Sequence, residues 1–293
     1  MMPAELVWDS RCALGEGAVW DVDGQSLFFV DILGREVLAF TPATGLQRRW
    51  PLPQMVGWVV PRRVGGWLAG LEQGIAGVRF DPDGTVALEW LQRLHAEGSP
   101  MRLNDAKADG AGRLWFGSMR HRNSTGAEGN FYRWQAGSPP VAVDGGYGVT
   151  NGPAISPDGR TLYHTDSPKR TVFAFDLAPD GSLSNKRSWL SFAPDEGFPD
   201  GMACDAQGHV WIAHWGGARV TERAPDGRVV RTFPVPAAHT SNVCFGGPDL
   251  RDLYITTARA GVPPGDLAGT PAAGGLFVVR GAGQGLAACS FAG

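Results

Sequence analysis

One turn-and-strand unit is repeated six times along the chain, and this repeat constrains the fold more than any other feature of the sequence. Each unit begins with a glycine-rich turn that leads into an apolar strand, as in DVDGQSLFFVDI from Asp21. Equivalent strand positions lie 40 to 48 residues apart, at Leu27, Trp67, Leu114, Leu162, Val210 and Leu253. A period of this size is typical of a four-stranded blade of a β-propeller.

The second half of each unit is another strand that ends in a turn, often an Asp-Gly pair such as Asp158-Gly159. Glycine there supplies the positive φ that tight hairpins need. A single blade cannot bury both of its faces, so blades must stack on their neighbours. We therefore predict an all-β protein, a six-bladed β-propeller that forms one domain over residues 1–293. The N-terminal segment AELVWDS could pair with the last blade and close the ring.

Composition and charge exclude several classes of partner. The sequence has 42 glycines and 22 prolines, and only 19% of its residues are charged, which favours many short strands over amphipathic helices. A net charge of -3 gives no electrostatic footprint for nucleic acid or an anionic membrane surface. The segment MMPAELVWDS lacks the basic region and apolar run of a secretory signal, and no stretch approaches the roughly 18 apolar residues of a membrane span. We expect a cytoplasmic protein without nucleic-acid or membrane partners.

Four polar segments interrupt the repeat in apolar or glycine-rich surroundings. They are LGEGAVW with Glu16, MRLNDAKAD with Arg102, Asn104 and Asp105, GVTNGPAIS with Asn151, and FPDGMACD with Asp200. Glu16, Asn104, Asn151 and Asp200 each precede the strand position of their unit by 10 or 11 residues. A common offset predicts a common level in the ring, where side chains from four blades would meet at the axis.

Such a set of carboxylate and amide oxygens, without His or Cys, suits a hard divalent ion. Ca²⁺, Mg²⁺ and Mn²⁺ are the first candidates, and Zn²⁺ and Fe²⁺ are further ones. The alternative is that Asn151 and Asp200 are ordinary turn residues, because each stands directly before a glycine.

At these segments the chain resembles the senescence-marker-protein, gluconolactonase and luciferin-regenerating-enzyme family, along nearly its whole length. The motifs that carry the resemblance are LGEGAVW, RLNDAKADGAGRLWFGSM, TNGPAISPDGRTLYHTDS, FPDGMACDAQGHVWIAHWGG and CFGGPDLRDLYITTAR. The resemblance implies that Glu16, Asn151 and Asp200 bind one divalent metal, and that Arg102 and Asn104 contact a sugar lactone.

The segment after GSM departs from regucalcin-like members of that family, which carry acidic residues there. This chain has Arg120, His121 and Arg122 instead. We predict that His121 and Arg122 lie on a loop at the mouth of the channel and face the lactone hydroxyls, with an ordinary solvated loop as the alternative. TDSPKR and HWGGARV resemble bacterial pentonolactonases, xylonolactonase in particular.

These observations predict a metal-dependent lactonase that hydrolyses an aldonolactone, such as xylono-, arabinono- or glucono-lactone, and acts as a monomer. The cation would polarise the lactone carbonyl. Asp200 is the candidate to deprotonate the attacking water, and a hydroxide on the metal is the alternative base. There is no G-x-S-x-G motif, and His164 and His214 could line the channel or pack between blades. The competing functions are a phosphotriesterase of the propeller type and a calcium-binding propeller without catalysis.

Overall fold

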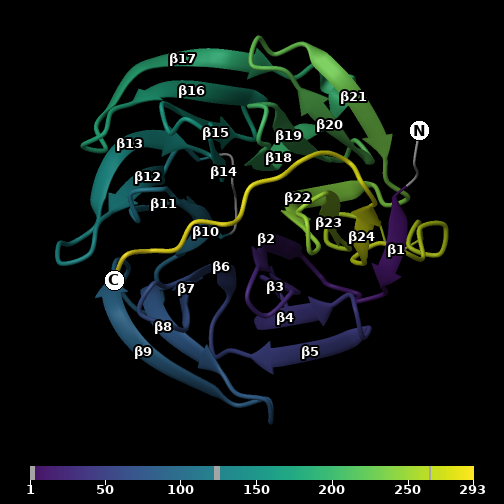
Figure 1. Ribbon diagram of the computed structural model, residues 1–293, viewed down its shortest axis with the longest axis horizontal. Coiled ribbons are helices and arrows are strands. Elements are labelled where there is room, and N and C mark those ends of the chain that lie inside the picture. The colour runs from purple at the N-terminus through teal and green to yellow at the C-terminus, as the bar shows by residue number, and fades with distance from the viewer. Residues whose placement is uncertain (1–3, 122–125, 264) are drawn as a thin grey trace.

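The repeat folds into antiparallel sheets that are arranged around one axis (Figure 1). The computed structural model describes residues 4–121, 126–263 and 265–293. Within these residues the elements are strands, apart from one short 3-10 helix, η1 (Pro194–Glu196). The protein is therefore all-β with a propeller arrangement, as the period of the repeat predicts.

Four sheets are separate and have four strands each. The first contains β2 (Gly15–Asp21), β3 (Ser26–Asp31), β4 (Glu36–Thr41) and β5 (Leu46–Pro51). The second contains β6 (Val56–Pro61), β7 (Trp67–Leu71), β8 (Gly74–Phe80) and β9 (Val86–Arg93). The third contains β10 (Met101–Ala108), β11 (Leu114–Arg120), β12 (Gly129–Trp134) and β13 (Val141–Tyr147). The fourth contains β14 (Thr150–Ile155), β15 (Thr161–Asp166), β16 (Thr171–Leu177) and β17 (Leu183–Ser191).

The remaining eight strands form one sheet, which corrects the expectation of six separate ones. One set contains β18 (Phe198–Cys204), β19 (Val210–Trp215), β20 (Arg219–Arg223) and β21 (Val229–Pro234). The other contains β22 (His239–Gly246), β23 (Asp252–Ala258), β24 (Leu276–Val279) and β1 (Glu5–Trp8). A single residue pair, Trp215 with His239, joins the two sets, and the two rings stack at 4.3 Å between their centroids. The repeat places the units, but it carries no information on such a lateral bridge.

The innermost strands follow one another around the axis in chain order. Each of β2, β6, β10, β14 and β18 contacts the next inner strand, and β22 contacts β2 to complete the circle (Figure 1). These strands run in the same sense along the axis, because each unit repeats the same hairpin order. Residues near the beginnings of the inner strands consequently meet at one end of the central channel.

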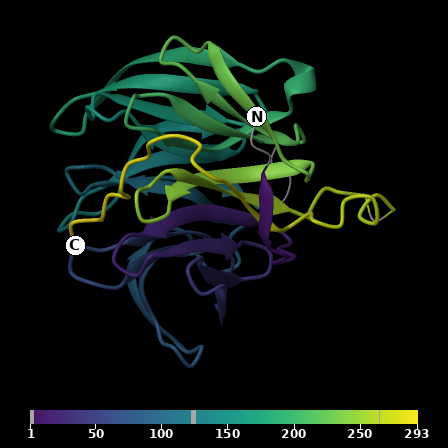
Figure 2. The ribbon, with the colours of Figure 1, turned by 45° about the vertical axis from the view of Figure 1, so that its right-hand side comes forward.

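The N-terminal segment closes the ring. Strand β1 pairs antiparallel with β24, with Glu5 opposite Val278 and Leu6 opposite Phe277, so the predicted pairing of AELVWDS with the last unit is confirmed. The pairing covers an edge that would otherwise be open. Between β23 and β24, residues 259–263 and 265–275 project from the side of the ring (Figure 2).

Apolar side chains from the strands fill the spaces between sheets. Trp115 and Trp211 are fully buried, and Trp67 packs on Phe28 of the neighbouring sheet with their ring centroids 4.3 Å apart. The Asp-Gly turn at Gly159 has the predicted positive φ of 68°. In the turn at Asp23-Gly24 it is instead the next residue, Gln25, that takes the positive φ, at 46°.

The C-terminal segment crosses the end of the channel that faces the viewer in Figure 1. There the inner strands end around a cavity of about 520 Å³, which residues 286–289 help to line. Phe291 anchors the segment: its backbone N–H donates to the Pro61 carbonyl at 2.9 Å, and its buried ring stacks on Trp134 at 4.3 Å. In the described part of the chain, no helix has the length and apolarity to cross a membrane.

Candidate metal centre and lactone-binding site

A cavity of about 530 Å³ lies where the inner strands begin, and its lining brings together five of the predicted residues. Its polar lining comprises Glu16, Arg102, Asn104, Asn151, Ser167 and Asp200. Glu16 lies on β2, Arg102 and Asn104 on β10, Asn151 on β14, and Asp200 on β18. Apolar side chains form the rest of the wall, including Phe198 and Trp215. Residues far apart in sequence thus converge, because each lies 10 to 12 residues before the strand position of its repeat unit.

The inner strands are irregular at the level of these side chains. The register of pairing shifts between Glu16 and Val19, between Leu103 and Ala106, between Asn151 and Ala154, and between Pro199 and Met202. Gly17 and Gly152, which directly follow Glu16 and Asn151, have φ of 58° and 73°. Glycine takes this conformation without the penalty that other residues incur. The bulges thus interrupt the regular alternation of the inner strands at the level of the cavity.

A chain of hydrogen bonds connects the polar side chains. Arg102 Nη1 donates to Asn104 Oδ1 at 2.6 Å, and Asn104 Nδ2 donates to Asn151 Oδ1 at 2.7 Å. Asn151 Nδ2 donates to Ser167 Oγ at 2.8 Å, and Ser167 Oγ donates to the Pro199 carbonyl at 2.7 Å. This series of hydrogen bonds passes through three neighbouring blades and ends beside Asp200, so the side chains hold one another in fixed orientations.

Three buried carboxyl groups lie near one another in this region. Burial, followed by the neighbouring Asp105, raises the pKa of Glu16 to about 8. Burial also raises the pKa of Asp105 to about 7, against an opposing effect of Lys107. Burial, and then Glu16 and Asp105, raise the pKa of Asp200 well above its usual range. Burial lowers the pKa of Arg102 to about 10, which leaves its guanidinium charged at neutral pH.

The donor set fits a hard divalent cation. Asp200 Oδ1 is buried and has no hydrogen-bond partner among the described residues, and the Asp200 side chain is only 4% exposed. Glu16 and Asn151 contribute further oxygens to the same cavity. Buried carboxylates are usually paired with a cation, and oxygen ligands suit ions such as Ca²⁺, Mg²⁺ and Mn²⁺. Together Glu16, Asn151 and Asp200 can hold such an ion.

Two further residues lie beside the site: Asn242, which was not selected from the sequence, and Asp105, which was noted there without a role. Asn242, on β22, is fully buried, and its Nδ2 donates to Glu16 Oε2 at 3.1 Å and to Asp105 Oδ2 at 3.3 Å. Asp105 lies directly after Asn104 in the RLND segment. The signal for Asn242 was present, because it precedes Leu253 by 11 residues, the offset that separates Glu16 from Leu27.

The predicted loop residues are placed only in part. His121 directly follows β11, and its backbone N–H donates to the Pro100 carbonyl at 2.7 Å. It is not among the described residues that line the cavity. Arg122 lies outside the described residues. The contact of His121 with substrate therefore stays a prediction.

His164 and His214 pack between blades and do not line the cavity. The His164 ring is fully buried and stacks on Phe131 at 3.9 Å. His214 Nε2 bonds to Thr221 Oγ1 at 2.8 Å. Burial lowers the pKa of His164 to about 3 and that of His214 to about 4, so both rings are neutral at physiological pH.

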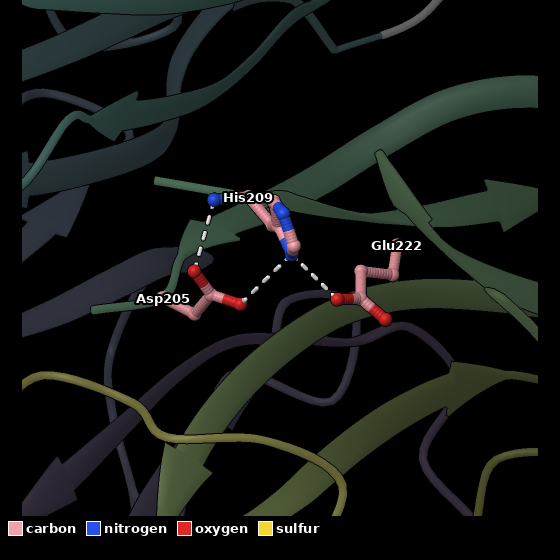
Figure 3. A group of neighbouring side chains, drawn as sticks. All are labelled: Asp205, His209 and Glu222. Atoms are coloured by element: carbon pink, nitrogen blue, oxygen red, sulfur yellow. Dashed lines mark hydrogen bonds and ion pairs between the residues drawn. The ribbon is translucent and has the colours of Figure 1, made fainter. Parts of the chain in front are cut away.

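A second group of possible metal ligands, Asp205, His209 and Glu222, lies outside the cavity (Figure 3). Their ligand atoms lie within 4.8 Å of one another, which is a spacing that can hold an ion. His209 Nδ1 lies 2.6 Å from Glu222 Oε1 and 3.7 Å from Asp205 Oδ2. However, Trp211 Nε1 already donates to Asp205 Oδ2, and Arg231 donates to Glu222 Oε2.

The third blade contains the counterpart of this group, and there it is an ion pair. Asp109 accepts from Arg113 Nε at 2.7 Å and from Trp115 Nε1 at 2.8 Å. Arg113 occupies the place of His209, four residues after the aspartate in both blades. The arrangement thus recurs as a turn that holds a buried tryptophan, and this favours a structural role for Asp205, His209 and Glu222.

Comparison with known proteins places this geometry in a family. The SMP-30/gluconolactonase/LRE-like region matches residues 14–259. A regucalcin of Oryctolagus cuniculus is 32% identical over 296 residues, 99% of this chain and 98% of that protein. The pentonolactonase XacC of Haloferax volcanii is 34% identical over 281 residues, 94% of each chain. The solved structure of a luciferin-regenerating enzyme has a TM-score of 0.94 at 26% identity and covers 100% of both chains. The chain belongs to the SMP-30/gluconolactonase/LRE-like family, as its motifs predict.

Proposed function

We propose that the protein hydrolyses a sugar-acid lactone to the free aldonic acid, with one divalent metal ion as cofactor. The observation that carries this proposal is one cavity that contains both an oxygen donor set and a polar pair able to orient a ring, Arg102 and Asn104. The similarity to a pentonolactonase supports an aldonolactone as the substrate class.

Glu16, Asn151 and Asp200 would hold the ion. When bound, a divalent cation supplies Lewis-acid polarisation of a carbonyl oxygen. Calcium, manganese, magnesium, zinc and iron are all candidates for this position. The unpartnered Asp200 Oδ1 supports the assignment, because a buried carboxylate oxygen without a donor is costly unless a cation or a proton satisfies it.

Arg102 and Asn104 would bind the lactone and fix its orientation. The Arg102 guanidinium is buried, and its Nε has no hydrogen-bond partner among the described residues, so donor capacity is left for a ligand oxygen. Fixing the carbonyl carbon against the attacking water contributes to catalysis by lowering the entropic part of the barrier. His121 and Arg122 would add contacts to the hydroxyl groups at the mouth.

Asp200 would act as the general base. Water adds to the lactone carbonyl carbon, and its proton passes to the Asp200 carboxylate. The bond between that carbon and the ring oxygen then breaks, and Asp200 returns the proton to the ring oxygen, which becomes the hydroxyl of the open acid. In the metal-free protein burial raises the pKa of Asp200, and a bound cation would lower it again by favouring the carboxylate.

The number of blades and domains is a further part of the proposal. We count the eight-stranded sheet as two blades, so that six blades form one domain over residues 1–293. A single residue pair between the two sets of strands supports this count, since each set repeats the hairpin order of the other sheets. We further propose that the protein is a cytoplasmic monomer whose partner is a small sugar lactone, without nucleic-acid or membrane partners.

A panel of lactones tests the activity. The protein is stripped of metal, reloaded separately with Ca²⁺, Mn²⁺, Mg²⁺, Zn²⁺ or Fe²⁺, and assayed on xylono-, arabinono- and glucono-lactone against spontaneous ring opening. We expect metal-dependent hydrolysis of at least one lactone. A phosphotriester assayed in parallel distinguishes the phosphotriesterase alternative. Calcium binding without hydrolysis of any substrate would instead favour a non-catalytic propeller.

A further inference from the structure

Ser167 links two of the three residues proposed to bind the metal. It directly follows β15 and is buried at the wall of the cavity, with 8% of its surface exposed. Its Oγ lies 2.8 Å from Asn151 Nδ2 and 2.7 Å from the carbonyl oxygen of Pro199, the residue before Asp200. Its backbone N–H donates to the Val149 carbonyl at 3.2 Å, which fixes the position of the serine.

The hydrogen bonds of Ser167 dictate which way the Asn151 amide points. A carbonyl oxygen can only accept, so the single hydroxyl proton of Ser167 must lie on the line to the Pro199 carbonyl. The Ser167 oxygen can then only accept a bond from Asn151, and the group that faces it must be the amide NH₂. The Asn151 oxygen is consequently directed to the opposite side, toward Asn104.

The orientation of Asn104 leads to the same assignment from the other side. Asn104 Nδ2 donates to the Thr150 carbonyl at 2.5 Å, which requires that its NH₂ faces the backbone of β14. The second proton of that NH₂ points at Asn151 Oδ1, 2.7 Å away. Both neighbours thus require that the oxygen of Asn151 faces Asn104, and of the two amide atoms only the oxygen can bind a cation.

We propose that Ser167 is a positioning residue for the metal, which presents Asn151 Oδ1 and fixes the strand that carries Asp200. The inference rests on the proposed function only in that Asn151 and Asp200 bind the ion. Without the hydroxyl, Asn151 Nδ2 would be buried without an acceptor, and the amide would gain from turning its NH₂ toward another partner. Removal of a residue that orients a metal ligand commonly weakens metal affinity by about 10-fold to 100-fold.

Titration calorimetry of Ca²⁺ and Mn²⁺ into metal-stripped protein tests this role. We expect Ser167→Ala to weaken the affinity by about 10-fold to 100-fold. Ser167→Thr keeps the hydroxyl and should bind within about threefold of the wild type, whereas the isosteric Ser167→Val should bind as weakly as the alanine variant. Comparing threonine with valine isolates the hydroxyl, because any effect of the added bulk is common to both.

Ser156→Ala is the matched control. Ser156 lies just after β14, at the far end of the channel, and its Oγ bonds to Asp158 Oδ1 at 2.6 Å and to the Thr161 backbone N–H at 2.9 Å. Its removal also costs two hydrogen bonds in the same blade, but metal affinity should stay unchanged. Chemical unfolding of the metal-free variants measures their loss of stability, which can then be compared with their loss of metal affinity.

The outcomes separate this inference from the proposed function. Wild-type protein that binds neither these two ions nor Mg²⁺, Zn²⁺ or Fe²⁺ would remove the metal site, and the role of Ser167 with it. Wild-type binding with equal affinities for the threonine and valine variants would overturn only the role of Ser167. A loss of affinity in Ser156→Ala as large as in Ser167→Ala would also overturn it, since the effect would then follow stability.

Discussion

Metal affinity at the proposed site should rise steeply with pH. In the metal-free protein, burial and the neighbouring Asp105 raise the pKa of Glu16 to about 8, so that at neutral pH this ligand carries a proton. A cation must displace that proton, because only the carboxylate binds it. With a pKa of about 8, the ionised fraction of Glu16 grows from about 1% at pH 6 to about 50% at pH 8. The affinity should therefore increase about 50-fold between these values, and more if Asp200 also releases a proton.

Calorimetric titration of Mn²⁺ at pH 6, 7 and 8, in two buffers with different enthalpies of protonation, measures both the affinity and the number of protons released. Asp105→Asn is the informative variant, because Asp105 is the largest cause after burial of the raised pKa of Glu16. This change should lower the pKa of Glu16 and reduce the ratio of affinities. An affinity that stays within about twofold from pH 6 to pH 8, without proton release, would refute the reasoning.

Three further predictions concern stability, each measured as the free energy of unfolding or the melting temperature. Metal-free protein should lose stability as pH rises toward 8, because folding raises the pKa of Glu16; Glu16→Gln should reduce this loss, and an unchanged pH profile would count against it. Phe291→Ala should cost about 3–5 kcal/mol, because the buried ring stacks on Trp134, and a cost below about 1 kcal/mol would mean that the C-terminal segment is not anchored there. His209→Arg should stay within about 1 kcal/mol of the wild type, as Arg113 fills the equivalent place, whereas a larger loss would contradict the structural role.

Much of the architecture could be predicted because the repeat is local. Turn residues such as Gly159 and the alternation of apolar residues fix each hairpin, and the spacing of the units leads to the ring. The bridge between Trp215 and His239 could not be predicted, because it depends on how closely two neighbouring sheets approach at their edges. The positive φ at Gln25 instead of Gly24 was not predicted either, because it depends on local turn geometry that the Asp-Gly pair does not specify.

Residues of the cavity could be predicted from the sequence where they precede the strand position of their repeat unit by 10 or 11 residues. Glu16, Asn104, Asn151 and Asp200 were selected in this way, and Asn242 has the same offset but lies in a segment without a conspicuous charge. Ser167 follows a different strand, so the offset carries no information about it. Its relation to Asn151 and Pro199 arises only when neighbouring blades pack together.

Asp200 and a divalent ion act together on a sugar lactone in the proposed function, and a comparison of rates shows whether both are needed. Initial rates of lactone hydrolysis are compared for metal-reloaded wild type, metal-stripped wild type and metal-reloaded Asp200→Ala, each corrected for spontaneous opening. We expect that removal of the metal abolishes hydrolysis and that Asp200→Ala lowers the rate by at least about 100-fold. Hydrolysis that persists at the wild-type rate after both metal removal and Asp200→Ala would contradict it.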